Sequence, residues 1–129
     1  MPRPRSTQPT NVELQILNVL WHQGPCTVRE VHKALMPQCD RGYSTTLKML
    51  QVMRGKGLVD RDDSVRPQLY QAAETKDQTQ LQMLDELMQK AFGGSAKKLV
   101  MRMLSANRLS AEELAEMQQL IDEAKGAEQ

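Results

Sequence analysis

The sequence has no long apolar run. None of its apolar stretches approaches the ~20 residues that a membrane-spanning helix needs, and the start, MPRPRSTQPT, has no apolar stretch of the signal-peptide kind. The sequence therefore predicts a protein that stays in the cytoplasm and does not insert into a membrane. It also lacks a nucleophile–base pair, a metal-ligand cluster and a phosphate-cradling glycine loop. We accordingly expect no enzyme, no cofactor and no metal site.

Cysteine is scarce as well. Cys26 and Cys39 are isolated thiols without CxxC spacing. In a reducing compartment, two such residues predict neither a disulfide nor a complete zinc site. His22 and His32 have no acidic or thiol partner at ligand spacing, which favours a surface or helix-packing role for each.

The residues that are present are typical of a globular protein. Of 129 residues, 40% are hydrophobic and 26% are charged, which suits one ordinary domain or a small domain with an added helical unit. The net charge of +1 conceals an asymmetry. Residues 1–70 carry ten Lys or Arg against six Asp or Glu, whereas residues 71–129 carry seven against ten. A basic half joined to an acidic half favours a polyanionic partner for the first half.

Capping boxes and helix breakers predict two helices near the start. In a capping box, a Ser or Thr hydroxyl accepts from the backbone N–H three residues on, and the Glu or Gln at that position reaches back. Such boxes begin at Thr10 and Thr27, which predicts a helix over 11–22 and a shorter one that ends before Pro37. The first helix carries apolar residues on two stripes. We therefore expect it to be buried on most of its circumference, with Trp21 as a core anchor.

A third helix and a hairpin follow. We expect this helix to enter at Tyr43 or Ser44 and to stop at Gly55–Gly57. The segments LVDR, DDSVR and PQLYQAA then predict a strand, a turn and a strand. Three short helices followed by a two-stranded ribbon form the layout of a winged helix-turn-helix. The predicted fold is therefore mainly α, with a winged-helix domain over 10–73 after a flexible segment, 1–9.

Beyond Ala73 the sequence predicts helices only. Capping signals at Thr75, Ser95 and Ser110 open three amphipathic helices. Helices of this size can hardly bury their apolar stripes against one another alone, so they need either the first domain or a second copy of themselves. Because a small helical tail of this type most often makes a symmetric dimer, we expect a three-helix dimerisation domain over 74–129 and a homodimer. The residues expected at the dimer seam are Leu81, Leu84, Leu87, Met88, Phe92, Leu99, Met103, Leu114, Met117 and Ile121.

The stretch STTLKMLQVM, from Ser44 to Met53, has two unlike faces on a helical wheel of about 100° per residue. The residues on the core-facing side are Thr46, Met49, Leu50 and Met53. Those on the opposite side are Ser44, Lys48 and Gln51, flanked by Thr45 and Val52. The second set offers hydrogen-bonding groups and no carboxylate, as a helix in the DNA major groove requires. An ordinary solvated helix face would use the same residue types, but the position directly before a hairpin in the basic half favours DNA binding.

Arginines lie close to this face and to the hairpin turn. Arg61 and Arg66 bracket the turn, and Arg54 lies at the boundary of the polar face. We expect them to contact phosphate or a minor groove. The aspartates beside them are Asp60, Asp62 and Asp63. As turn formers and pairing partners, these aspartates argue against a strongly phosphate-bound wing.

A series of segments carries a family resemblance. They are ELQILNVLW (13–21), TVREVHKAL (27–35), YSTTLKMLQVMRGKGLVDRD (43–62), LYQAA (69–73), FGGS (92–95), LV (99–100) and LSAEELAEMQQLI (109–121). In this order and spacing they resemble the penicillinase repressors, the BlaI/MecI/CopY type of bacterial transcriptional repressor. The resemblance implies a winged-helix domain, a helical dimerisation domain and a homodimer on a palindromic double-stranded DNA operator.

The resemblance also assigns residues by position. It implies that Ser44, Thr45, Lys48 and Val52 contact DNA from the recognition helix. The helical wheel adds Gln51 to this set. Where members similar to the β-lactamase repressors have an arginine at the position of Val52, this chain has an apolar side chain. Such a side chain is suited to a thymine methyl group.

Two routes of release are known in such families, and the sequence bears on both. One is cleavage of the helical tail when a membrane zinc-metalloprotease sensor is activated, and the matching bond here lies at Arg102–Met103, within LVMRML. The other, copper sensing, uses a C-terminal cysteine cluster that the ending IDEAKGAEQ lacks. An alternative interpretation of the whole chain is a winged-helix protein–protein interaction module without sequence-specific DNA binding. The aspartate-rich wing and the modest net charge favour that alternative.

Overall fold

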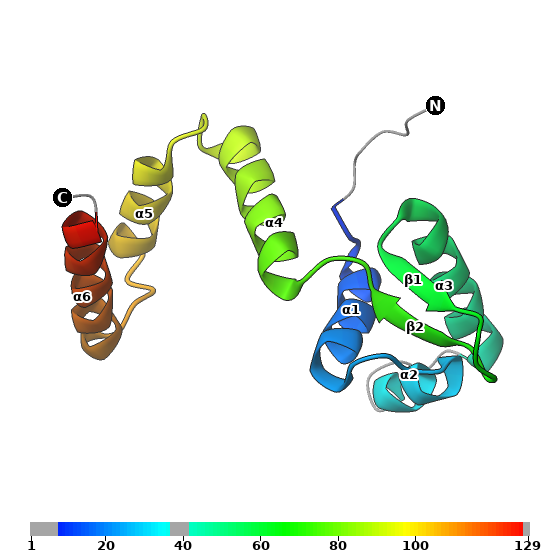
Figure 1. Ribbon diagram of the computed structural model, residues 1–129. Helices are drawn as coiled ribbons and strands as arrows, with labels where there is room; N and C mark the ends of the chain where they lie inside the picture. Colours follow the sequence, from blue (N-terminus) through cyan, green and yellow to red (C-terminus); the bar gives the residue numbers. More distant parts are fainter. Residues whose placement is uncertain (1–7, 37–41, 128–129) are drawn as a thin grey trace. The chain divides into compact units, whose positions relative to one another are not determined.

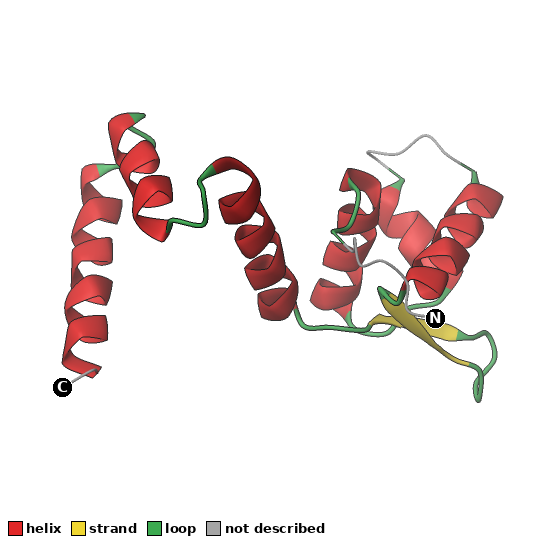
Figure 2. Cartoon of the chain, turned by 90° about the horizontal axis from the view of Figure 1, so that it is seen from above, coloured by secondary structure: helices red, strands yellow, loops and turns green. Residues whose placement is uncertain are grey.

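The computed structural model of the protein describes residues 8–36 and 42–127. The elements in order are α1 (Asn11–Gln23), α2 (Val28–Leu35), α3 (Tyr43–Lys56), β1 (Val59–Asp62), β2 (Leu69–Ala72), α4 (Lys76–Ala91), α5 (Ala96–Ser105) and α6 (Ala111–Ala127) (Figures 1 and 2). This order confirms the predicted fold class, a mainly helical chain with a two-stranded wing. Of the residues named above, Pro37 and Cys39 lie outside the described part, as does most of segment 1–9.

The chain forms two compact units, of which the first extends to Met83 and the second begins at Leu84. The boundary lies within α4, further along the chain than the change to all-helical sequence at residue 73. Within the described residues, no helix is long and apolar enough to cross a membrane.

The core of the first unit is built from all three of its first helices and both strands. α1 packs against α2 and β2, α2 packs against α3, and α3 packs against β1. The buried apolar residues are Ile16, Leu17, Leu20, Cys26, Val31, Leu35, Leu50, Met53, Val59 and Tyr70. Burying side chains of this size removes about 1.5–3 kcal/mol each of unfavourable hydration, which is the main stabilisation available to so small a unit.

α1 is covered on most of its sides, as its sequence predicts. Ile16, Leu17 and Leu20 are buried, and Leu14, Val19 and Trp21 are partly buried against the core. Trp21 lies at the rim of the core, not within it. Its indole Nε1–H donates to the Glu74 carbonyl at 2.9 Å, which joins the end of α1 to the segment leading into α4. The prediction that α1 is buried on most of its circumference is confirmed, because its exposed residues lie mainly on one side.

The wing is a short antiparallel pair that is tied to the helices at its base. Val59 pairs with Ala72 and Arg61 with Tyr70. Cys26 exchanges both backbone hydrogen bonds with Tyr70, at 2.9 and 2.7 Å, so the connection between α1 and α2 continues the ladder. Burial raises the pKa of the free Cys26 thiol, and the charge of Glu30 adds to the effect. A buried protonated thiol is unreactive, in line with the ordinary role expected from the sequence.

Side-chain caps begin five of the described helices. The reciprocal capping boxes expected at the first two helices, before α4 and before α6 are all formed, and a serine caps α5. The cap residues are Thr10, Thr27, Thr75, Ser95 and Ser110. Each cap satisfies backbone N–H groups that the helix itself leaves free, which contributes about 1 kcal/mol. These predictions are confirmed.

An ion pair between a buried carboxylate and a half-exposed lysine joins the start of α1 to the end of α3. The Glu13 carboxylate is nearly inaccessible and accepts from Lys56 Nζ at 2.6 Å and from the Thr10 backbone N–H at 3.0 Å. Burial raises the pKa of Glu13, but these hydrogen bonds and the Lys56 charge outweigh burial and hold the pKa below its ordinary value. The stability from the pair is therefore present above the pKa that Glu13 has in the unfolded chain. It is lost as the pH falls through the lower folded-state pKa.

We expect Glu13→Gln to lower the free energy of unfolding by about 1–3 kcal/mol at neutral pH and to weaken its dependence on pH below about 4. Urea unfolding, followed by the fluorescence of the single tryptophan, Trp21, measures the free energy of unfolding of the first unit. Glu30→Gln is the matched control, because Glu30 has the same capping role in α2 but is exposed. Equal losses in the two variants would show that the cap matters and the ion pair does not.

The second unit has little core of its own. No residue of α5 or α6 is buried, and Gly93 and Gly94, both with positive φ, separate α4 from α5. The large apolar side chains left exposed along α4–α6 are Leu81, Leu84, Leu87, Val100, Met101, Leu104, Leu114, Leu120 and Ile121. Three helices that leave this much apolar surface in water are not stabilised by their contacts with one another.

Candidate nucleic-acid interface

α3 is held on one side by the core and by two polar contacts. Thr46, Leu50 and Met53 are buried, as the helical wheel predicts. The Thr46 hydroxyl lies 3.0 Å from His32 Nδ1 on α2, and the Glu13–Lys56 pair holds the C-terminal end. The helix stops at Gly57, whose φ of 84° is a left-handed conformation that glycine adopts without strain. Its orientation on the domain is therefore fixed at both ends.

The opposite face of α3 is open to solvent. The exposed residues there are Ser44, Thr45, Lys48, Gln51, Val52 and Arg54, and the apolar Val52 is 46% exposed. No carboxylate lies on α3 at all. The predicted division of the helix into a buried and an exposed face is confirmed. That the exposed residues contact DNA stays a prediction.

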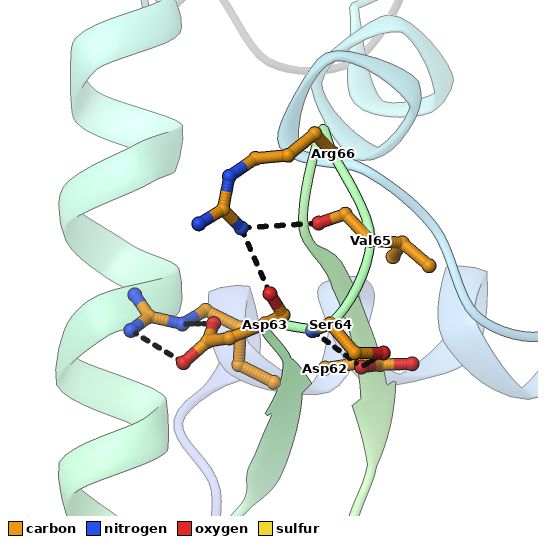
Figure 3. Close-up of polar contacts among 6 residues, drawn as sticks. Asp62, Asp63, Ser64, Val65 and Arg66 are labelled. Carbon is orange, nitrogen blue, oxygen red and sulfur yellow. Dashed lines mark hydrogen bonds and ion pairs between the residues drawn. The ribbon is translucent and has the colours of Figure 1, made fainter.

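Both arginines of the wing have partners within the hairpin (Figure 3). Arg61 pairs with the Asp63 carboxylate, with Nε 2.5 Å from one oxygen and Nη2 3.2 Å from the other. Hydrogen bonding to Asp63 and Tyr70 raises the pKa of Arg61. Arg66 Nη1 donates to the carbonyls of Asp63 and Val65, at 2.8 and 3.2 Å. A phosphate contact by either arginine would have to replace these bonds.

The turn itself is organised by Asp62. Its carboxylate accepts from the Ser64 backbone N–H at 2.9 Å and from the Ser64 hydroxyl at 2.6 Å, and these hydrogen bonds hold the pKa of Asp62 below its ordinary value. The expectation that the aspartates form the turn and pair with the arginines is confirmed at Asp62 and Asp63. Within the described residues, Arg61 pairs with a carboxylate and Arg66 bonds two backbone carbonyls, whereas Arg54 has neither kind of partner.

Sequence reasoning missed one group of side chains at the start of α3. The Arg29 guanidinium lies over the Tyr43 ring, 5.5 Å from its centroid. Tyr43 in turn meets the edge of His32, with ring centroids 6.0 Å apart. Arg29 and His32 are three residues apart on α2, a spacing that places both on one side of a helix. That spacing was the signal available in the sequence.

The residues predicted for the dimer seam and for cleavage lie on α4–α6, except Phe92, which directly follows α4. Five are exposed, namely Leu81, Leu84, Leu87, Leu114 and Ile121, and five are partly covered, namely Met88, Phe92, Leu99, Met103 and Met117. The Arg102–Met103 bond is within α5, where Arg102 is exposed. Across 8–36 and 42–127, no three His, Cys, Asp or Glu side chains are grouped as a metal ion would require.

A fixed helix with an open polar face, next to a two-stranded wing, defines a winged-helix DNA-binding transcriptional regulator. The chain belongs to the penicillinase repressor family, whose model matches residues 9–123. A MarR family protein from Bacillus stearothermophilus has a similar solved structure, with a TM-score of 0.51 and 18% sequence identity. The similarity covers 92% of this chain and 74% of that one, and at this identity it concerns the fold. No curated protein sequence matches the chain.

Proposed function

We propose that the protein is a homodimeric transcriptional repressor that binds a pseudo-palindromic operator, with α3 of each copy in the major groove. The observation that carries the proposal is the composition and exposure of one face of α3. Ser44, Lys48 and Gln51 project from a helix whose other side is anchored in the core. Side chains held in this way reach base edges with little loss of conformational freedom.

Each exposed residue has a distinct role in this proposal. Lys48 and Gln51 are long enough to bond base edges, and Ser44 and Thr45 lie at the helix start, where HTH proteins read DNA. Val52 contacts a thymine methyl group. Arg54 is the cation best placed for phosphate, because Arg61 and Arg66 are engaged within the wing.

The exposed apolar surface of α4–α6 supports the homodimer. A second copy covers that surface in an isologous interface, and it sets the distance between the two recognition helices to match the half-sites. Phosphate contacts made by both copies supply much of the affinity, so operator binding weakens steeply with salt.

Release of the operator is proposed to follow cleavage at Arg102–Met103 by a membrane zinc-metalloprotease sensor. The bond lies in a ten-residue helix with no buried residue, and such a helix opens locally at low cost, which a protease requires. Cleavage would remove α6 from the dimer seam. An intact chain after induction, with no fragment ending at Arg102, would refute this part.

The variant Lys48→Ala tests whether the exposed face of α3 contacts the operator. We expect it to weaken operator binding between about fivefold and 150-fold, equivalent to roughly 1–3 kcal/mol if Lys48 bonds a base. The measurement is a gel shift on the DNA upstream of the chain's own gene, after footprinting has located the protected palindrome.

Lys97→Ala is the matched control, since it removes one exposed cation from α5. Sedimentation and Trp21 fluorescence confirm that both variants remain assembled and folded. If Lys48→Ala is folded and binds the operator normally, the exposed face of α3 does not read the major groove. A wild-type chain that protects no palindrome would instead favour the protein–protein interaction module.

A further inference from the structure

The guanidinium of Arg29 is placed at the recognition end of α3 and forms no ion pair with any described residue. Arg29 is exposed on α2 and is held over the ring of Tyr43, the residue that directly precedes Ser44. In the described residues, no carboxylate lies within 4 Å of Arg29. Its neighbour Glu30 is committed to the cap of α2, where it accepts from the Thr27 backbone N–H at 2.9 Å.

Arg29 differs in this respect from the arginines of the wing. Arg61 and Arg66 have internal partners that a phosphate would have to displace. Arg29 rests on an aromatic face, which orients a guanidinium without using its N–H donors. All five donors of Arg29 therefore remain available to an anion, and the fork geometry suits the oxygens of a phosphate.

Tyr43 is itself fixed by the layer beneath it. Its ring packs against the edge of His32 at an interplanar angle of 78°, and His32 bonds the buried Thr46 hydroxyl. Thr46 on the inner side of α3 thus holds His32, His32 supports the ring of Tyr43, and that ring supports the guanidinium of Arg29. A cation supported in this way loses less rotamer freedom on binding than a free surface arginine does.

We infer that Arg29, positioned by Tyr43, binds the DNA backbone phosphodiester that flanks the bases read by Ser44 and Thr45. This inference rests on the proposed function and adds a phosphate contact that neither the wing nor α3 supplies. The contact is independent of base sequence, so Arg29 contributes similarly to operator and to unrelated duplex.

The salt dependence of binding tests the inference. Each phosphate contact adds about 0.9 to the slope of log affinity against log salt. A homodimer with Arg29→Ala loses one such contact in each copy, so between about 50 and 200 mM salt its affinity is expected to fall roughly tenfold less than that of the wild type. Arg29→Lys retains the charge and the slope. Lys97→Ala, which removes one cation from the second unit, leaves the slope unchanged.

The positioning role of Tyr43 has a separate readout. Tyr43→Phe keeps the aromatic face and is expected to bind as the wild type does, whereas Tyr43→Leu weakens binding severalfold. In an Arg29→Ala background the effect of Tyr43→Leu should vanish, because the ring then has no cation to place. Trp21 fluorescence in urea verifies folding, and Arg29→Gln serves as a second neutral variant.

Two results would overturn the inference. If the salt slope is unchanged in Arg29→Ala and Arg29→Gln, Arg29 contacts no phosphate. If the effects of the Arg29 and Tyr43 changes are additive, Tyr43 does not position Arg29. Both leave the repressor proposal intact, provided that the wild type binds its operator and Lys48→Ala binds it more weakly. A wild type with no operator binding would refute the proposed function and, with it, this inference.

Discussion

A chain carrying Leu114→Asp and Ile121→Asp is expected to be monomeric and to bind its operator about 10²–10⁴-fold more weakly than the wild type. Both side chains are on α6 and are 43% and 49% exposed. Because α6 buries no residue within its own chain, two carboxylates there remove nothing from a core. In a dimer seam they would be buried without partners, and the interface would not form.

The loss of affinity follows from geometry alone. A dimer binds its second half-site at the high effective concentration set by the first, and a monomer does not. Sedimentation measures the assembly, gel shifts measure the affinity, and Trp21 fluorescence shows that the first unit is unaffected. Ala115→Asp with Gln119→Asp is the matched control, since it adds the same charges on the opposite side of α6. If the Leu114/Ile121 variant remains a dimer, α6 is not part of the seam.

The second large effect is expected at Leu50, which is fully buried on the inner face of α3. Leu50→Ala should lower the free energy of unfolding by about 2–5 kcal/mol, through lost burial and the cavity left behind. Operator affinity should fall only to the extent that the chain unfolds. Urea unfolding followed by Trp21 fluorescence measures the stability change.

Val52→Ala is the companion change on the outer face. Val52 is two residues further along α3 and 46% exposed, so its truncation should change stability by no more than about 0.5 kcal/mol. We expect it to weaken operator binding severalfold and to reduce the preference for thymine at one position, because the methyl contact is lost. The reverse pattern, with Val52 controlling stability and Leu50 controlling binding, would mean that α3 faces the opposite way.

Much of the fold could be predicted from local sequence. The capping boxes at Thr10, Thr27, Thr75 and Ser110 involve residues three apart, so their bonds form whenever the helix does. The faces of α3 follow from helical periodicity in the same way. The wing was predictable because a turn rich in aspartate and proline separates two short apolar segments.

Long-range contacts were not predictable in this way. Trp21 lies at the rim because the Glu74 carbonyl, from a distant part of the chain, meets its indole. The capping role of Glu13 follows from its position in the helix. Its ion pair with Lys56 forms only because α3 packs next to the start of α1. The pairing of Arg61 with Asp63 is not of this kind, because the two residues are neighbours in the hairpin.

The sequence by itself determined which segments of this chain form helices and which face of α3 is polar, since both depend on neighbours within one or two helical turns. Tertiary structure alone decided that Lys56 pairs with Glu13 and that Arg29 rests on the ring of Tyr43. The reason is physical: a charge–charge or cation–ring contact depends on distances of a few ångströms between elements, and helical periodicity carries no information about those distances.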